Sequence, residues 1–120
     1  MSLGIYHVYS LLNKLRNSGA QIDFKDKSIY IKSTKRPIAC ASIETQPYPG
    51  FPTDLQAQIL AMQTISDGIS VITENMFETR FKHVPELIKM GAKVTIKDRM
   101  AIVRGVSCLY GTEVVAQDLR

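Results

Sequence analysis

The chain has 120 residues, of which 45% are hydrophobic and 22% charged, as is ordinary for one globular domain, or part of one, that buries a core. No apolar run approaches membrane-spanning length, and the N-terminus has no signal-peptide pattern. The net charge of +4 fits anionic ligands, but the basic residues are scattered, so nucleic-acid binding is not indicated.

The periodicity of apolar residues and the turn-forming residues between them predict a mixed α/β chain without linkers. Residues 1–3 are interpreted as a cloning remnant and are left out of this pattern. In chain order we expect a helix over 5–15, strands over 20–24, 28–32 and 38–44, a helix over 54–66, a strand over 69–73, a helix over 84–90, and strands over 93–97, 100–104 and 112–117.

The two cysteines, Cys40 and Cys108, fall in predicted strands and lack CxxC spacing. This pattern favours reduced, partly buried thiols over a disulfide, a metal pair or a nucleophile.

The segment 46–58 has the most distinctive composition, because it places three prolines and a glycine in six residues before a helical pattern. Prolines restrict both their own φ and the residue before them, so a stiff loop is expected. Thr53 followed by Gln56 reads as a capping box, which puts Asp54 in the first helical turn. Two interpretations stay open: a well-capped helix, or a loop that holds one acid at a cleft.

An internal repeat is visible at an offset of 72, where residues 19–26 match residues 91–98. Thr53-Asp54-Leu55 matches residues 117–119 at an offset of 64, so the first copy carries eight extra residues, which the proline loop accommodates. The repeat predicts units of roughly 5–66 and 67–120. It also predicts that Asp54 and Asp118 lie at the same rim and that Leu55 turns inward.

Several separated motifs resemble the enolpyruvyl transferases, and within them the sugar-nucleotide branch rather than the shikimate branch. They lie in the order expected for that family at 47–58, 72–81, 83–87, 90–92, 104–106 and 118–120. The resemblance implies an inside-out α/β barrel fold, of which this chain would hold about two of the repeated units in one domain. The remaining units of a two-domain enzyme, including the loop with the reactive cysteine, would lie outside it.

The resemblance also implies a reaction, in which enolpyruvyl passes from phosphoenolpyruvate to the 3-hydroxyl of UDP-N-acetylglucosamine in bacterial peptidoglycan synthesis. It assigns the general base to Asp54 and a second catalytic acid, near phosphoenolpyruvate, to Asp118. Substrate binding falls to four residues: Thr53, Met76, Arg80 and Arg120. No cofactor or metal is expected, the location is expected to be cytoplasmic, and the chain alone is expected to be inactive.

Other interpretations stay open beside this one. Arg80 on its own would be read as a surface partner of Glu74 or Glu78, and His83 as a cap or surface residue rather than a base. The chain as a whole could instead be a non-catalytic module that binds a nucleotide sugar or phosphate. A piece of a larger enzyme should expose apolar surface where its neighbours belong, and it is expected to self-associate.

Overall fold

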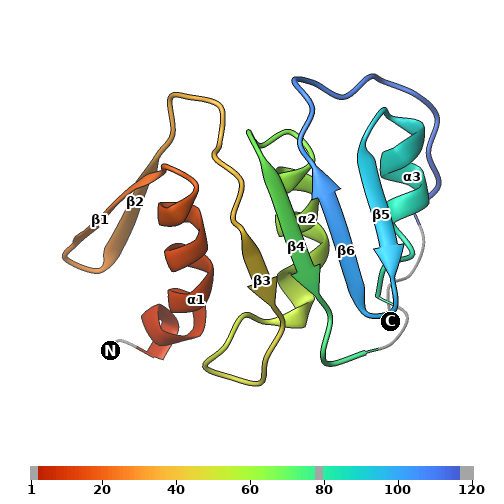
Figure 1. The fold of residues 1–120 in the computed structure, drawn as a ribbon. Helices are drawn as coiled ribbons and strands as arrows, with labels where there is room; N and C mark the ends of the chain where they lie inside the picture. Colours follow the sequence, from red (N-terminus) through yellow and green to blue (C-terminus); the bar gives the residue numbers. More distant parts are fainter. Residues whose placement is uncertain (1–2, 78–79, 117–120) are drawn as a thin grey trace.

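The computed structural model describes residues 3–77 and 80–116, and these ranges form the mixed α/β structure that the sequence predicts (Figure 1). The elements in chain order are α1 (Leu3–Asn17), β1 (Gln21–Lys25), β2 (Ser28–Lys32), β3 (Ser42–Glu44), the 3-10 turn η1 (Thr53–Leu55), α2 (Gln56–Gln63), β4 (Ile69–Thr73), α3 (Val84–Lys89), β5 (Lys93–Lys97) and β6 (Met100–Arg104). None of the helices in these ranges has the length and apolar character of a membrane span.

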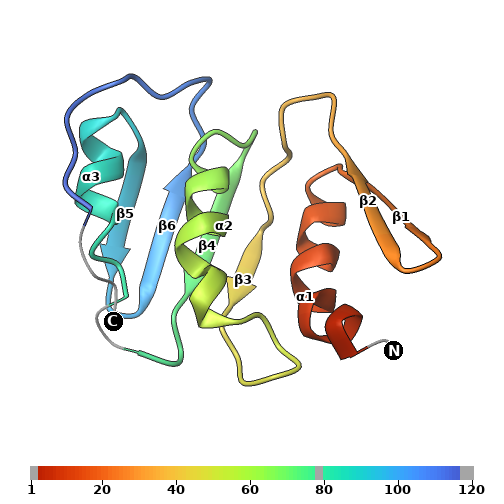
Figure 2. The same ribbon diagram turned by 180° about the vertical axis from the view of Figure 1, so that it is seen from behind.

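A four-stranded sheet in the order β3-β4-β6-β5 is the centre of the structure. β3 and β4 are parallel, whereas β6 is antiparallel to both of its neighbours. A parallel pair needs a crossover connection, and α2 provides it. Both α2 and α3 lie on the same face of the sheet, which is the near face in Figure 2. No helix of the described residues lies over the other face in either view.

The core lies between this sheet and its helices, because alternate strand residues point toward α2. Ile72 of β4 is fully buried and lies opposite the fully buried Ala101 of β6. Ile59 and Leu60 of α2 belong to the same buried cluster. Burying a leucine or isoleucine side chain of this cluster contributes about 1.5–3 kcal/mol. This packing holds α2, and the turn before it, against the ends of β3 and β4.

The hairpin β1–β2 forms a separate two-stranded sheet, and α1 lies between it and β3 (Figure 1). Lys14 of α1 connects to the main sheet twice: its Nζ donates to the Ser42 carbonyl at 2.9 Å, and its carbonyl accepts from the Cys40 thiol at 3.3 Å. Leu12 of α1 and Ile22 of β1 are both buried. The hairpin is therefore joined to the rest of the structure through α1.

Two predicted strands are shorter or absent. The strand predicted over 38–44 is confined to β3, with one isolated bridge at Ile38, because the Cys40 N–H donates to the Gln63 side chain at 2.9 Å instead of to a strand. The strand predicted over 112–117 is not formed over 112–116, where Val115 N–H donates to the Glu86 carboxylate at 2.8 Å. In both places a side chain takes the backbone donor that a strand ladder would need.

Both cysteines are free thiols, as predicted, but neither lies in a strand. Cys40 is buried, and its sulfur lies 3.1 Å from the Ser18 hydroxyl. Cys108 is exposed in the segment after β6.

The two hairpins have the same register at the offset of 72. β1–β2 pairs Gln21 with Lys32, and β5–β6 pairs Lys93 with Arg104. Their turns also match, because the aspartates at 26 and 98 have φ of 53° and 55°. These matches support the proposed repeat. The proposed boundary at 66/67 lies inside the four-stranded sheet, since β3 precedes it and the other three strands follow.

The helices before the two hairpins end in the same way. Gly19 and Gly91 have φ of 99° and 101°, and each is followed by an alanine whose N–H reaches back into the last helical turn. This Schellman pattern requires a left-handed residue after the helix, which favours glycine. The bonds run from Gly19 to Arg16, from Ala20 to Leu15, from Gly91 to Ile88 and from Ala92 to Leu87, at 3.0–3.1 Å.

Candidate active site

The carboxyl ends of β3 and β4 meet at one edge of the sheet, because the strands are parallel neighbours. Thr45 directly follows β3, and Glu74 directly follows β4. The proline loop and η1 continue the chain after Thr45, and the segment 75–77 continues it after Glu74. Both segments lie at the lower end of the sheet in Figure 1. This edge therefore brings together residues that are about thirty positions apart in the sequence.

The proline loop is anchored to this edge by Phe51, which is 2% exposed. Gln46 N–H donates to the Phe51 carbonyl at 2.9 Å, and Gly50 N–H closes the turn onto the Pro47 carbonyl at 2.8 Å. Tyr48, at the tip, is 59% exposed. The loop thus leads the chain out and back to η1 at a fixed place.

The predicted capping box is wrong. Thr53 begins a 3-10 turn, α2 starts only at Gln56, and the helix ends at Gln63 rather than at 66. Neither helix start has a side-chain capping bond. The Thr53 hydroxyl and the Gln56 amide both donate to Glu74 instead, at 2.8 and 3.1 Å. A buried carboxylate is a stronger acceptor for these donors than a neutral capping partner.

Asp54 lies in η1 with its side chain 63% exposed, as the prediction of a solvent-facing acid requires, and Leu55 is half-buried against the core. Arg80 donates from Nη1 to Asp54 Oδ1 at 3.2 Å. The arginine side chain is only 10% exposed, and its guanidinium stacks on the Phe77 ring at 4.4 Å from the centroid. The interpretation of Arg80 as a surface partner of Glu74 is therefore wrong, and Glu78 lies outside the described residues.

Glu74 is the site residue that the sequence prediction missed. Its carboxylate is 1% exposed and accepts five hydrogen bonds. The donors are the hydroxyls of Thr45 and Thr53, the Gln56 amide, and the N–H groups of Met76 and Phe77, at 2.8–3.3 Å. Burial raises the pKa of this carboxyl, but the bonds from Thr53, Met76, Thr45 and Gln56 outweigh burial and hold the pKa below the ordinary 4.5.

The remaining predicted site residues divide into two groups. Met76 lies on the same edge, 39% exposed, with its N–H bound to Glu74 at 3.0 Å. Asp118 and Arg120 lie outside the described residues. The prediction that Asp54 and Asp118 lie at the same rim involves Asp118 and therefore stays a prediction. The structure thus brings Thr53, Asp54, Met76 and Arg80 together around one buried carboxylate.

His83 lies elsewhere, in an apolar hollow of about 400 Å³ between α2, α3 and the segment 114–116. It occupies the N-cap position of α3 but makes no capping bond, and both ring nitrogens are buried without a hydrogen-bond partner in the described structure. Burial lowers the pKa of the ring below its ordinary 6.5. His83 therefore occupies the position of a cap, as one interpretation expected. Its side chain makes no capping bond, and its ring nitrogens are not at the surface.

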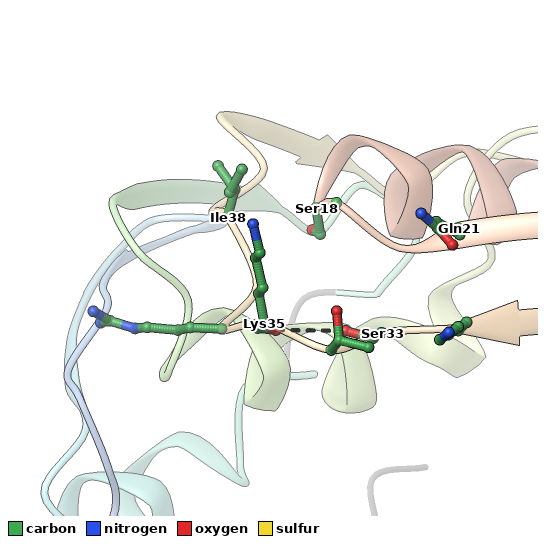
Figure 3. Close-up of a pocket in the computed structure, with 9 residues that line it drawn as sticks. Ser18, Gln21, Ser33, Lys35 and Ile38 are labelled. Carbon is green, nitrogen blue, oxygen red and sulfur yellow. Dashed lines mark hydrogen bonds between the residues drawn. The ribbon is translucent and has the colours of Figure 1, made fainter.

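A second hollow, of about 280 Å³, lies at the opposite end of β3, between the end of α1 and the segment 32–38 (Figure 3). Lys35 extends toward Ser18 and Ile38, and the Ser33 hydroxyl donates to the Lys35 carbonyl at 3.5 Å. Arg36 instead donates from Nε to the Ile65 carbonyl at 2.9 Å, at the end of α2. This hollow contains none of the predicted site residues. Nor do the described residues contain a group of three or more side chains suited to a metal ion.

Comparison with known proteins places the chain in a family. The family model of EPSP synthase (3-phosphoshikimate 1-carboxyvinyltransferase) matches residues 3–120. The chain is 50% identical over 114 residues to the UDP-N-acetylglucosamine 1-carboxyvinyltransferase of Orientia tsutsugamushi (strain Ikeda), covering 95% of this chain and 27% of the relative. It is 46% identical over 119 residues to the protein of the same name from Geobacter metallireducens, covering 99% and 28%.

The fold comparison agrees. The structure superposes on the enolpyruvyl transferase NikO from Streptomyces tendae with a TM-score of 0.75 at 20% identity, over 84% of this chain and 23% of that one. The predicted fold, part of an inside-out α/β barrel of the enolpyruvyl transferase type, is confirmed. The chain spans little more than a quarter of the length of the curated relatives that it matches.

Proposed function

Because this chain belongs to the EPSP synthase family, we propose that it forms one part of a UDP-N-acetylglucosamine 1-carboxyvinyltransferase. One observation carries the proposal: relatives with that name are 44–50% identical to it over nearly its whole length. The shikimate branch, which also belongs to the family, is less favoured, because six relatives at 44–50% identity all carry the sugar-nucleotide name.

In this proposal Asp54 is the general base for the 3-hydroxyl of UDP-N-acetylglucosamine. A sugar hydroxyl attacks slowly until a positioned base takes its proton, and a solvent-facing carboxylate on a fixed turn suits that task. Asp54 has both properties, since its side chain is open and η1 is held by the bond from Thr53 to Glu74. Closure of the other domain over this edge would then exclude water from the reacting groups.

Substrate binding falls to the residues around that base. The Arg80 guanidinium is fixed by Phe77 and Asp54, so it offers its remaining donors to an anionic substrate in one orientation. Met76, which is 39% exposed, and Thr53 lie at the same edge of the sheet, since both donate to Glu74. Asp118 keeps its proposed role near phosphoenolpyruvate, and Arg120 its proposed role in binding an anionic substrate. The enzyme would act in the bacterial cytoplasm, in peptidoglycan synthesis.

The rival function is a non-catalytic module that binds a nucleotide sugar or a phosphate. The exposed apolar side chains favour the enzyme part, because a self-contained module should cover them. The hairpin alone exposes Phe24, Tyr30 and Ile31 by 46–56%, and the main sheet exposes Ile69 by 50%.

The test is a chimera in which this chain replaces the matching segment of the Geobacter metallireducens enzyme. Phosphate release from phosphoenolpyruvate, dependent on UDP-N-acetylglucosamine, is expected at a rate within about tenfold of the parent, because a site preserved in position keeps its transition-state contacts. The intact parent is the control for the assay. A chimera that unfolds at the parent's temperature but releases no phosphate would contradict the proposal.

The chain by itself should release no phosphate in the same assay. It carries one wall of the proposed site, and catalysis by positioning needs both walls. Turnover by the chain alone at a rate near that of the parent would show that the proposed division of the site is wrong.

A further inference from the structure

Glu74 is the one fully buried acid among the described residues at this sheet edge, and its five donors come from four segments. Its Oε1 accepts from Thr53 in η1 and Gln56 in α2, and its Oε2 accepts from Thr45 after β3 and from the turn at Met76 and Phe77. All five donors are neutral groups. A carboxylate that accepts this many bonds is held ionised and in one place.

Gln56 connects the Glu74 carboxylate to the backbone of Arg80. Gln56 Nε2 donates to Glu74 Oε1 and to the Arg80 carbonyl, each at 3.1 Å. Because both neighbours are acceptors, only the nitrogen of this amide can face them, so its orientation is fixed. Gln56 is 1% exposed and lies in the first turn of α2. The Arg80 backbone is therefore attached to Glu74 through a single buried amide.

The two ends of this network meet again at the Asp54–Arg80 pair. Thr53, the residue before Asp54, bonds directly to Glu74, and Arg80 is attached through Gln56. The 3.2 Å bond between the arginine and the aspartate closes the loop. Moving the carboxylate of Glu74 would thus move both members of the pair.

We infer that Glu74 is the positioning residue of this site, and that its buried carboxylate sets the geometry of the Asp54–Arg80 pair without touching substrate. The inference rests on the proposed function for its catalytic consequence only. The link from Glu74 through Gln56 to Arg80 is a property of this chain and can be tested in it alone.

The first test is Glu74→Gln in this chain, read by NMR. The glutamine can keep one oxygen toward Thr45, Met76 and Phe77 while its amide nitrogen faces Thr53, whose hydroxyl can accept. Gln56 cannot adapt in this way. In its present orientation its amide nitrogen would face the new amide nitrogen at position 74, so two donors would meet. In the flipped orientation its oxygen would face the Arg80 carbonyl, which would then have no donor. Hydrogen exchange at the Arg80 Nη1 group, which bonds to Asp54, should therefore accelerate by about tenfold, while exchange at the Met76 amide changes less.

The matched control is Glu44→Gln, the same change on the neighbouring parallel strand, where the carboxylate is exposed. Exchange at Arg80 should not change in this variant. If Glu74→Gln leaves Arg80 exchange as it is in the unmodified chain, the inference is overturned. If Glu74→Gln does not fold, Gln56→Met decides, because it removes only the amide link. Unchanged Arg80 exchange in Gln56→Met overturns the inference equally.

The second test places both Glu74→Gln and Glu44→Gln in the chimera. A misplaced base lowers kcat, so Glu74→Gln should reduce kcat by about tenfold or more and change the Kd for UDP-N-acetylglucosamine by much less. Equal losses in kcat and binding would indicate a merely structural role and overturn the inference. An inactive unsubstituted chimera would count against the proposed function, and the NMR result would still decide the role of Glu74.

Discussion

Asp54 and Arg80 form a pair in which the arginine is nearly buried and the aspartate is open to solvent. We expect Asp54→Asn in the chimera to reduce turnover by about 10²–10⁴-fold, because asparagine keeps the size but cannot accept the proton. Binding of UDP-N-acetylglucosamine should change far less. Initial rates of phosphate release and calorimetric binding measure the two effects.

Asp67→Asn is the control for that substitution. Asp67 is also an exposed aspartate, with a side chain 79% exposed and a weak contact of 4.0 Å to Arg36, but it lies at the other end of α2. Its substitution should leave turnover unchanged. A loss of less than about fivefold in Asp54→Asn would demote Asp54 from base to a structural residue.

His83 predicts a pH dependence of stability. Burial lowers its pKa in the folded chain below the 6.5 of the unfolded chain, so the unfolded state binds more protons between the two values. The stability is thus complete above about pH 6.5 and falls as the pH decreases below that value. Urea unfolding at pH 7.5 and 5.5 should show this loss, and His83→Phe should remove most of it.

Lys82→Gln provides the comparison for His83→Phe, because Lys82 is the exposed neighbour of His83. The loss in the free energy of unfolding between pH 7.5 and 5.5 should be the same in Lys82→Gln as in the unsubstituted chain. An unchanged loss in His83→Phe would mean that His83 is not the group responsible.

The loop and capping pattern singled out Thr53 and Asp54, the family resemblance implied Met76 and Arg80, and the structure brings these four together. Neither the pattern nor the resemblance predicted Glu74, because a single glutamate after an apolar strand has no spacing that distinguishes it from a surface residue. Its role depends on five donors from distant segments, and only the folded chain brings them within reach. The capping prediction failed for the same reason, since Thr53 bonds across the edge to Glu74 and not along its own helix.

At the level of elements, the paired helix ends give a sharp prediction. Gly19 and Gly91 occupy the same left-handed position after α1 and α3. Gly19→Ala should lower the free energy of unfolding by about 1–2 kcal/mol, although nothing lies within 4 Å of the added methyl, because the backbone conformation disfavours a side chain. Urea unfolding measures the loss.

Gly91→Ala should cost at least as much, since its methyl would also meet Tyr110 Cδ2 at 3.3 Å. Gly111→Ala is the control: its surroundings are equally open but its φ is not in the left-handed region, and it should change stability by less than about 0.5 kcal/mol. Equal losses at 19 and 111 would show that the left-handed conformation is not the cause.

The hairpins and β4, an apolar β-branched run over Ile69–Thr73, were predictable, whereas the limits of β3 were not and the strand over 112–117 was wrong over 112–116. The hairpins β1–β2 and β5–β6 carry their own turns, so sequence alone placed both. β3 is three residues long and exists because β4 lies beside it, which no local pattern reveals. The valines at 114 and 115 have strand propensity, but their segment runs past α3 instead of joining the sheet. Tertiary context outweighs propensity at such places.

The whole molecule leaves one face of the first hairpin partly uncovered, and this predicts self-association. Ile22 is buried against α1, whereas Phe24 and Ile31 on the same face are about half exposed. Sedimentation of the chain over micromolar concentrations should show a dimer, since symmetric pairing is a common way to cover such a surface. Phe24→Lys should shift the equilibrium to monomer.

Tyr30→Lys is the matched control, because Tyr30 is 56% exposed on the opposite face of the same hairpin. It should leave the dimer in place. A monomer at all concentrations in the unsubstituted chain would count against association through this hairpin.

The parallel pairing of β3 and β4 also has a consequence for the order of folding. Thr45 and Glu74 are 29 positions apart, and they meet only after the chain has passed through the proline loop and α2. Closing such a non-local pair is slow compared with forming a helix or a hairpin. In a refolding experiment the network around Glu74 should therefore form late, after helical signal has recovered. Asp54 and Arg80 face one another only when both strands are in place. The time at which refolding protein first binds UDP-N-acetylglucosamine would therefore report when β3 and β4 pair.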